Sequence, residues 1–146
     1  MRNLVLTAAL ALITTCIFGQ SRQEQTQILQ KCLDLQELQQ YYPVDADGNP
    51  NTLIIHYCHP FTLPTDLTVT HGGRNAEFRL MSVENDKNAD AYFFFQKFEI
   101  LESTCHVSLK YCYGNSGNPK EIQVLLDLKK TGDAWAITNY TVNNQD

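Results

Sequence analysis

The 146-residue chain lacks a hydrophobic run long enough to cross a membrane. Its longest apolar stretch, residues 4–13, falls short of the roughly 20 residues that a spanning helix needs. Clustered positive charge is also missing: the nearest approach is Lys129-Lys130, and 11 basic residues stand against 16 acidic ones. Because phosphate binding depends on clustered Lys and Arg, we do not expect nucleic acid as a partner.

Several motifs of catalysis and cofactor binding are absent too. The chain has no Gly-x-Ser-x-Gly nucleophile motif, no cysteine-protease signature and no glycine-rich phosphate loop, since His71-Gly72-Gly73-Arg74 reads as a plain turn. The tight Cys-x2-Cys or His-x3-His spacing of common zinc sites is missing as well. We therefore expect no cofactor, and the sequence assigns no catalytic residue.

What the chain does contain begins with an export signal. Arg2 precedes the apolar run and the small residue Gly19 precedes a polar stretch, which is typical of a secretory signal peptide. We expect cleavage after Gly19, which leaves residues 20–146 as one domain in the periplasm or outside the cell. The alternative is a lipid on Cys16 that anchors the same domain to a membrane, with Thr15 where bacterial lipoproteins have a small residue.

The spacing of apolar residues predicts one helix followed by a sheet. Over residues 24–42 apolar side chains recur at three- and four-residue steps, and Pro43 ends the pattern. The period then changes to two, and strands are predicted at 53–58, 67–70, 77–83, 91–101, 105–113, 121–130 and 134–142. Short turns join the last four strands into an antiparallel meander. A single amphipathic helix can bury its stripe only against the dry face of this sheet, which predicts a two-layer α+β domain.

The order of these elements resembles a known group of folds. One N-terminal helix followed by a long meander that ends in Trp135-Ala136-Ile137-Thr138-Asn139-Tyr140-Thr141-Val142 is similar to the cystatin-like and NTF2-like folds. The signal ending in Phe18-Gly19-Gln20 is similar to those of exported Bacteroidota proteins. The resemblance covers most of residues 20–146 in outline. It implies a helix that packs on a curved antiparallel sheet.

The same resemblance bears on function. Its members include ketosteroid isomerase, dehydratases, protease inhibitors and non-catalytic binding modules. NTF2-like enzymes usually have a longer helical N-terminal part, and cystatin inhibitors carry a Gln-x-Val-x-Gly loop that is missing here. We therefore expect a non-catalytic binding or assembly module whose partner is a protein or a small apolar ligand. The alternatives are a small enzyme with a pocket in the concave face of the sheet, and a metal-binding protein.

The metal alternative depends on histidines and cysteines that share a strand face. Because alternate residues of a strand point the same way, parity places four such side chains on the polar face of two predicted strands. These are His56, Cys58, His106 and Cys112. If the two strands were neighbours in suitable register, the group could bind zinc or copper.

Disulfide bonds are the other interpretation of the cysteines. Four remain after signal removal, and an even number in an exported chain favours bridges. Parity favours Cys58 with Cys112 on the outer face, and Cys32 of the helix with Cys105 of the sheet beneath it. Three connectivities are formally open.

Aromatic residues provide a further candidate site. The run Tyr92-Phe93-Phe94-Phe95 points side chains to both faces of one strand, so a second side of that strand must also be covered. Core packing is the default interpretation, and a ligand pocket or partner surface is the alternative. The pocket candidates are Phe94, Phe98, Tyr111 and Trp135. A homodimer through the sheet would cover the same residues.

Mass spectrometry of the unreduced, alkylated protein tests the cysteine prediction. We expect at least one bridge, because the exported chain meets an oxidising compartment. A bridge between Cys32 and Cys105 would close a long loop and stabilise the fold by about 4 kcal/mol in the chain-entropy model. Four alkylated thiols would contradict the disulfide interpretation and favour the metal site.

Overall fold

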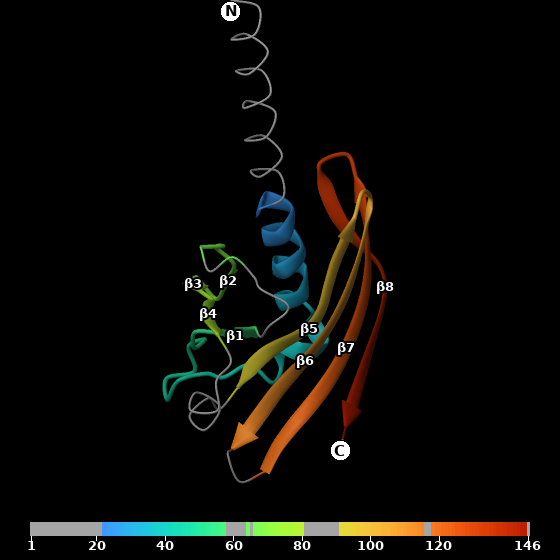
Figure 1. Ribbon diagram of the computed structural model, residues 1–146. Coiled ribbons are helices and arrows are strands. Elements are labelled where there is room, and N and C mark those ends of the chain that lie inside the picture. Colours follow the sequence, from blue (N-terminus) through green and yellow to red (C-terminus); the bar gives the residue numbers. More distant parts are fainter. Residues whose placement is uncertain (1–21, 58–63, 65, 81–90, 116–117, 146) are drawn as a thin grey trace, which may run out of the picture.

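The computed structural model describes residues 22–57, 64, 66–80, 91–115 and 118–145. A helix over residues 22–33 lies against the long strands of a curved sheet, and a group of short strands lies at the flank opposite the C-terminal strand (Figure 1). The predicted signal peptide, with Cys16, is outside the described residues. Among the helices that are described, none is long and apolar enough to cross a membrane.

The predicted helix is broken into two pieces. Residues 22–33 are helical, Leu35 is extended (φ −61°, ψ 118°), and a four-residue helix, α2 (Gln36–Gln39), follows. The prediction of a continuous helix up to Tyr42 is therefore wrong. Apolar spacing does not reveal the break, because Leu35, Leu38 and Tyr42 are all buried in the same core on either side of it.

Side chains satisfy the backbone at this break. The hydroxyl of Tyr42 donates to the carbonyl oxygen of Leu33 at 2.8 Å, and the side-chain amide of Gln39 donates to the carbonyl oxygen of Asp34 at 3.3 Å. The last carbonyl groups of a helix have no partner within the helix, so an outside donor is needed when they are buried. Tyr42 thus closes the end of the long helix and fills the core at the same time.

The predicted meander is confirmed. It consists of β5 (Tyr92–Leu101), β6 (Thr104–Asn115), β7 (Asn118–Thr131) and β8 (Ala134–Gln145), each antiparallel to the next. Two irregularities interrupt the register, one between Phe95 and Lys97 in β5 and one at Thr138 in β8, where Asp127 pairs with Asn139 but Leu128 pairs with Ile137. Such bulges increase the twist of a strand, which suits a sheet that curves around a helix.

The short strands extend this sheet in a way that the sequence pattern does not predict. β1 (Ile54–Tyr57) lies between β4 (Glu77–Leu80) and β5 and is parallel to both, so the described sheet has the order β4-β1-β5-β6-β7-β8. β2 (Thr70–His71) and β3 (Arg74–Asn75) form a separate hairpin whose turn residues Gly72 and Gly73 both have positive φ. The predicted strands at 53–58 and 77–83 are thus found in part, and Cys58 and residues 81–83 lie outside the described residues.

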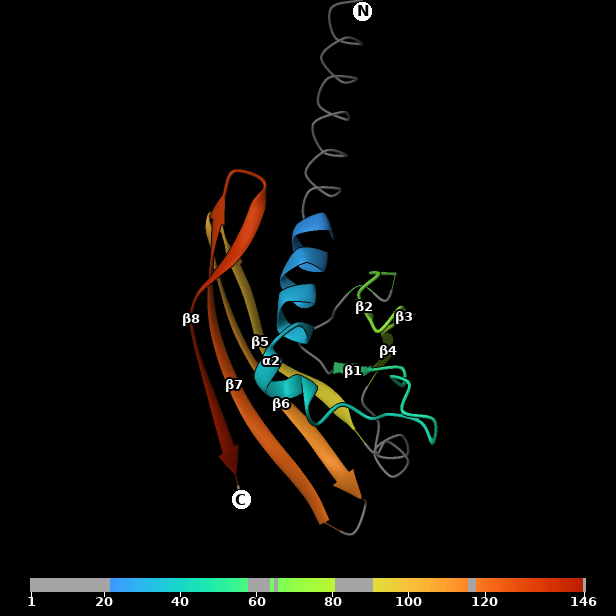
Figure 2. The same cartoon turned by 180° about the vertical axis from the view of Figure 1, so that it is seen from behind.

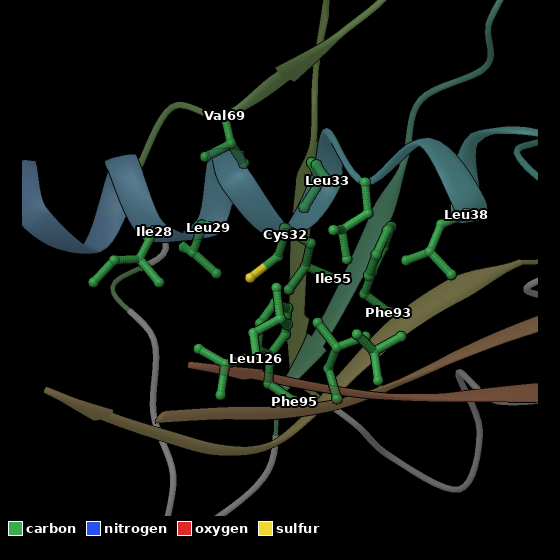
Figure 3. Packing of buried hydrophobic residues seen from close by; sticks show 14 of the residues in the cluster. Ile28, Leu29, Cys32, Leu33, Leu38, Ile55, Val69, Phe93, Phe95 and Leu126 are labelled. Carbon is green, nitrogen blue, oxygen red and sulfur yellow. The ribbon is translucent and has the colours of Figure 1, made fainter. Parts of the chain in front are cut away.

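The core lies between the helix and the dry face of the sheet. Ile28, Leu29 and Cys32 project from the helix toward the sheet, and Phe95 and Leu126 rise from it (Figure 3). All five side chains are at most 2% exposed. Along β7 the buried residues alternate with outward ones, and the buried set is Ile122, Val124, Leu126 and Leu128. The two-layer arrangement of helix and sheet is thereby confirmed.

A pair of adjacent leucines tests this alternation. Leu126 is 2% exposed in the core, whereas Leu125 is 48% exposed on the opposite face. We expect Leu126→Ala to lower the free energy of unfolding by about 2–5 kcal/mol, because it removes buried methyl groups and leaves a cavity. Leu125→Ala should change it by less than about 0.5 kcal/mol. Urea unfolding of both variants measures the difference, and equal losses would contradict the register of β7.

Candidate functional site

The predicted pocket residues are distributed between both faces of the sheet. Tyr111 is fully buried in the core, where its hydroxyl donates to the carbonyl oxygen of Tyr41 at 3.0 Å. Phe98 packs on the core with its ring centroid 6.1 Å from that of Phe95. Phe94 is half-buried on the opposite face, because Phe93 and Phe95 take the two core positions beside it. These residues do not form a common pocket.

Two of the four residues of the predicted metal site, His106 and Cys112, lie far apart. His106 and Cys112 share one face of β6 but are six residues apart, which is about 20 Å along a strand. His56 is fully buried on β1 with its ring 4.7 Å from that of Tyr92, and Cys58 lies outside the described residues. In the described part of the chain, no three His, Cys, Asp or Glu side chains are placed to hold a metal ion.

The cysteines of the predicted inner bridge are both in the core. Cys32 and Cys105 are completely buried and are free thiols in the structure. Burial raises the pKa of Cys105 to about 12, and burial together with the nearby Cys105 thiol raises the pKa of Cys32 still further. The helix thus places Cys32 near Cys105, although they are not joined. Of the predicted outer pair, Cys112 is buried opposite Tyr92 and Glu121, and Cys58 is not described.

The outer face of the sheet carries a polar row that crosses four strands. Glu99, His106, Asp127 and Asn139 are directly opposite one another on β5, β6, β7 and β8. His106 Nδ1 lies 2.7 Å from Asp127 Oδ1, and Lys97 Nζ lies 2.9 Å from Glu99 Oε2. The Lys97 ammonium holds the pKa of the Glu99 carboxyl below its usual value. A shallow cavity of about 300 Å³ is lined by His106, Asp127 and Asn139 of this row and by the next row, Lys97, Ser108, Leu125 and Thr141.

This polar row and the next one together contain the residue types of a Ser-His-Asp triad without its geometry. The hydroxyl of Ser108 donates to Gln96 Oε1 at 3.3 Å and accepts from Gln123 Nε2 at 3.2 Å. A nucleophilic serine needs the imidazole as its hydrogen-bond partner, and here two glutamines take that position. The His106 and Asp127 side chains are also about half exposed, so water screens their interaction.

Sequence reasoning did not find the His106–Asp127 pair. Alternation places each residue on the solvent-facing side of its own strand, and this is the sequence signal that could have indicated the pair. Alternation gives the face of a residue but not the register between strands, so it cannot say which residues are opposite each other. Parity grouped His106 with Cys112 for a different reason: it gives the face of one strand that two residues share and ignores the six-residue separation between them along that strand.

A second hollow follows the line where the helix meets β8, which we call the helix–β8 seam. It consists of a cavity of about 380 Å³ and an adjoining one of about 280 Å³, which share Lys31 and Asp34 of the helical segment as lining residues. Trp135 lines the first cavity and Tyr140 the second. Of the predicted pocket residues, Trp135 is therefore the one that borders this open space.

Polar contacts brace the seam along its length. At one end Lys130 forms an ion pair with Glu24, and Gln27 both donates to the carbonyl oxygen of Asp133 and accepts from the backbone N–H of Trp135. At the other end the hydroxyl of Tyr140 donates to Glu37 Oε1 at 2.6 Å. This hydrogen bond is the main reason that the pKa of the Glu37 carboxyl lies below its usual value. The helical segments therefore hold β8 at both ends of the seam.

Tyr140→Phe tests the contact between α2 and β8. We expect the pKa of Glu37 to rise toward its ordinary value of about 4.3, because the variant removes the main hydrogen bond to the carboxylate. A lowered carboxyl pKa stabilises the fold above the unfolded-state pKa, and this contribution is lost as the pH falls through the folded-state pKa. The stability difference from the wild type should therefore shrink in acid.

An NMR titration of the Glu37 carboxyl measures the pKa in this variant. Tyr113→Phe on β6 is the control, because the Tyr113 ring stacks on that of Tyr111 in the meander. An unchanged Glu37 pKa in Tyr140→Phe would show that the hydroxyl does not bond to the carboxylate.

Known proteins offer no independent assignment of this site. No protein-family model, no curated protein and no solved structure matches the chain. The two hollows, the polar row and the strands that carry them are therefore the features that bear on function.

Proposed function

We propose that this chain is an exported, non-catalytic binding or assembly module that binds its partner along β8. The observation that carries this proposal is the character of β8, a twelve-residue strand at the end of the described sheet order. Its sequence contains no charged residue, no proline and no glycine. Figure 2 shows β8 on the outer flank of the meander, away from β1 to β4.

An edge strand of this kind attracts other strands. Its outer N–H and C=O groups can pair with another chain, and proteins that must avoid this place lysine, proline or very short strands at the edge. β8 has none of these protections, and its one irregularity is the bulge at Thr138. The side chains along it are mostly exposed, including Tyr140 at 45%. Addition of a strand to a sheet edge is an established mode of peptide and protein recognition.

The opposite side of the domain favours binding over catalysis in a concave pocket. The helix fills the dry face of the sheet with side chains such as Leu29, Leu33 and Phe93, each fully buried. The pairs His106–Asp127 and Lys110–Glu121 lie on the outer face, where the partners of each pair contact each other at 2.7 Å. We therefore expect a partner to contact the flank of the sheet, and not a catalytic group on its dry face.

The resemblance to a fold group and the expected location also support the proposal. A helix on a curved meander agrees with the cystatin-like and NTF2-like resemblance, whose members include non-catalytic binding modules. The signal-peptide pattern of residues 1–19 supports a location in the periplasm or outside the cell. The metal-binding alternative is less well supported, because β6 holds His106 and Cys112 far apart.

Site-specific photo-crosslinking in the exporting cell tests this function. A benzoylphenylalanine at Thr141, on the edge strand, should give a discrete covalent adduct, because a bound strand would lie next to it. The same amino acid at Leu101, which is 49% exposed at the end of β5, is the control. No adduct at Thr141 beyond that at Leu101 would overturn the proposed function.

A further inference from the structure

We propose that the strand that binds at the β8 edge is β8 of a second copy of this chain, in antiparallel pairing over residues 139–145. This inference rests on the proposed function and names the partner. The bulge at Thr138 interrupts the first part of the strand, whereas residues 139–145 pair with β7 without interruption. The regular segment is thus centred on Val142. When two such segments pair in antiparallel fashion, the two-fold axis that relates the copies passes between their Val142 residues.

Charge favours a second copy over a different chain. Residues directly opposite each other across a strand pair destabilise it when they carry like charges. The whole chain has a formal net charge of −5, yet β8 contributes no charge to it. Two copies can therefore approach edge to edge along β8 without placing one charged side chain opposite another. Inner strands such as β7, with Glu121, Asp127 and three lysines, would not allow this.

The apolar side chains at the edge fit the same arrangement. On the helix side of the sheet, Tyr140 is opposite Leu126 and Val142 is opposite Val124 in β7. Tyr140 is 45% exposed and Val142 is half-buried, so the last strand leaves apolar surface uncovered. In a pairing centred on Val142, the two Val142 side chains meet on this face and each Tyr140 is opposite Asn144 of the other copy.

Symmetry explains why pairing would stop at two copies. An antiparallel pair of identical strands is related by a two-fold axis, so each copy uses its own β8 edge and the contact closes. The two sheets would then join into one, with both helices on the same face. The edge strand at the far end of the described order, β4, has only four residues and offers a much shorter edge.

Sedimentation equilibrium of the exported protein tests the pairing and its register. In the proposed register Thr141 of one copy is opposite Asn143 of the other. We expect a wild-type dimer with a Kd in the micromolar range, of the order that suits a small interface. T141K/N143K places lysine opposite lysine twice and should weaken the dimer at least about tenfold. T141K/N143E places lysine opposite glutamate and should restore a Kd within about threefold of the wild type.

Leu125→Lys is the matched control, because Leu125 is opposite Thr141 on the same face but one strand in from the edge. It should leave the Kd unchanged, and thermal unfolding should show that all variants fold. Amide hydrogen exchange of the wild type needs no variant: protection of residues 139–145 should increase with protein concentration.

Three results would overturn the inference. These are a wild-type protein that is monomeric at about 200 μM, equal weakening by T141K/N143K and T141K/N143E, and exchange at residues 139–145 that does not depend on concentration. An adduct at Thr141 with a different protein, together with a monomeric purified chain, would refute the second copy and leave the binding function standing. The absence of any adduct would refute the binding function itself.

Discussion

Packing of the helix at residues 22–33 on the dry face of β5 to β8 is the interaction on which the rest of the structure depends. Neither surface is stable alone in water, because each exposes a continuous set of large apolar side chains. Leu29 and Cys32 on one side and Phe93 and Leu126 on the other remove each other from solvent completely or nearly so. The chain is small enough to have one such core, so every other feature is placed relative to it.

The core determines what each remaining surface can do. Because the helix occupies the dry face, the polar row with His106 and Asp127 must lie on the outer face, where water reaches it. The helical segments hold β8 through Gln27 and Glu37, while the edge of that strand stays uncovered by the other described strands. A strand that hydrogen bonds already hold in place loses less conformational entropy when another strand binds, which favours association.

The sequence predicted the elements better than their partners. The strands of the meander and the alternation of buried and wet residues in β7 follow from a period of two, and the structure has both. The break at Leu35 was missed, since apolar spacing continues through it. The parallel pairing of β1 with β4 and β5 was not predicted either, because strand order depends on contacts between segments that are distant in the chain. The candidate site was predicted least well. Parity grouped His106 with Cys112 on one face of a strand, although six residues separate them along it.

The sequence by itself determined which side chains are apolar, their period, and the absence of charge from residues 134–145. These are local properties, and each restricts an element before the chain folds. Only the tertiary structure decided that β8 is an edge strand, that Asp127 is opposite His106, and that Tyr140 reaches Glu37. Strand order and register are set by the free energy of packing a whole helix on a whole sheet. A pattern within one strand carries no information about that choice.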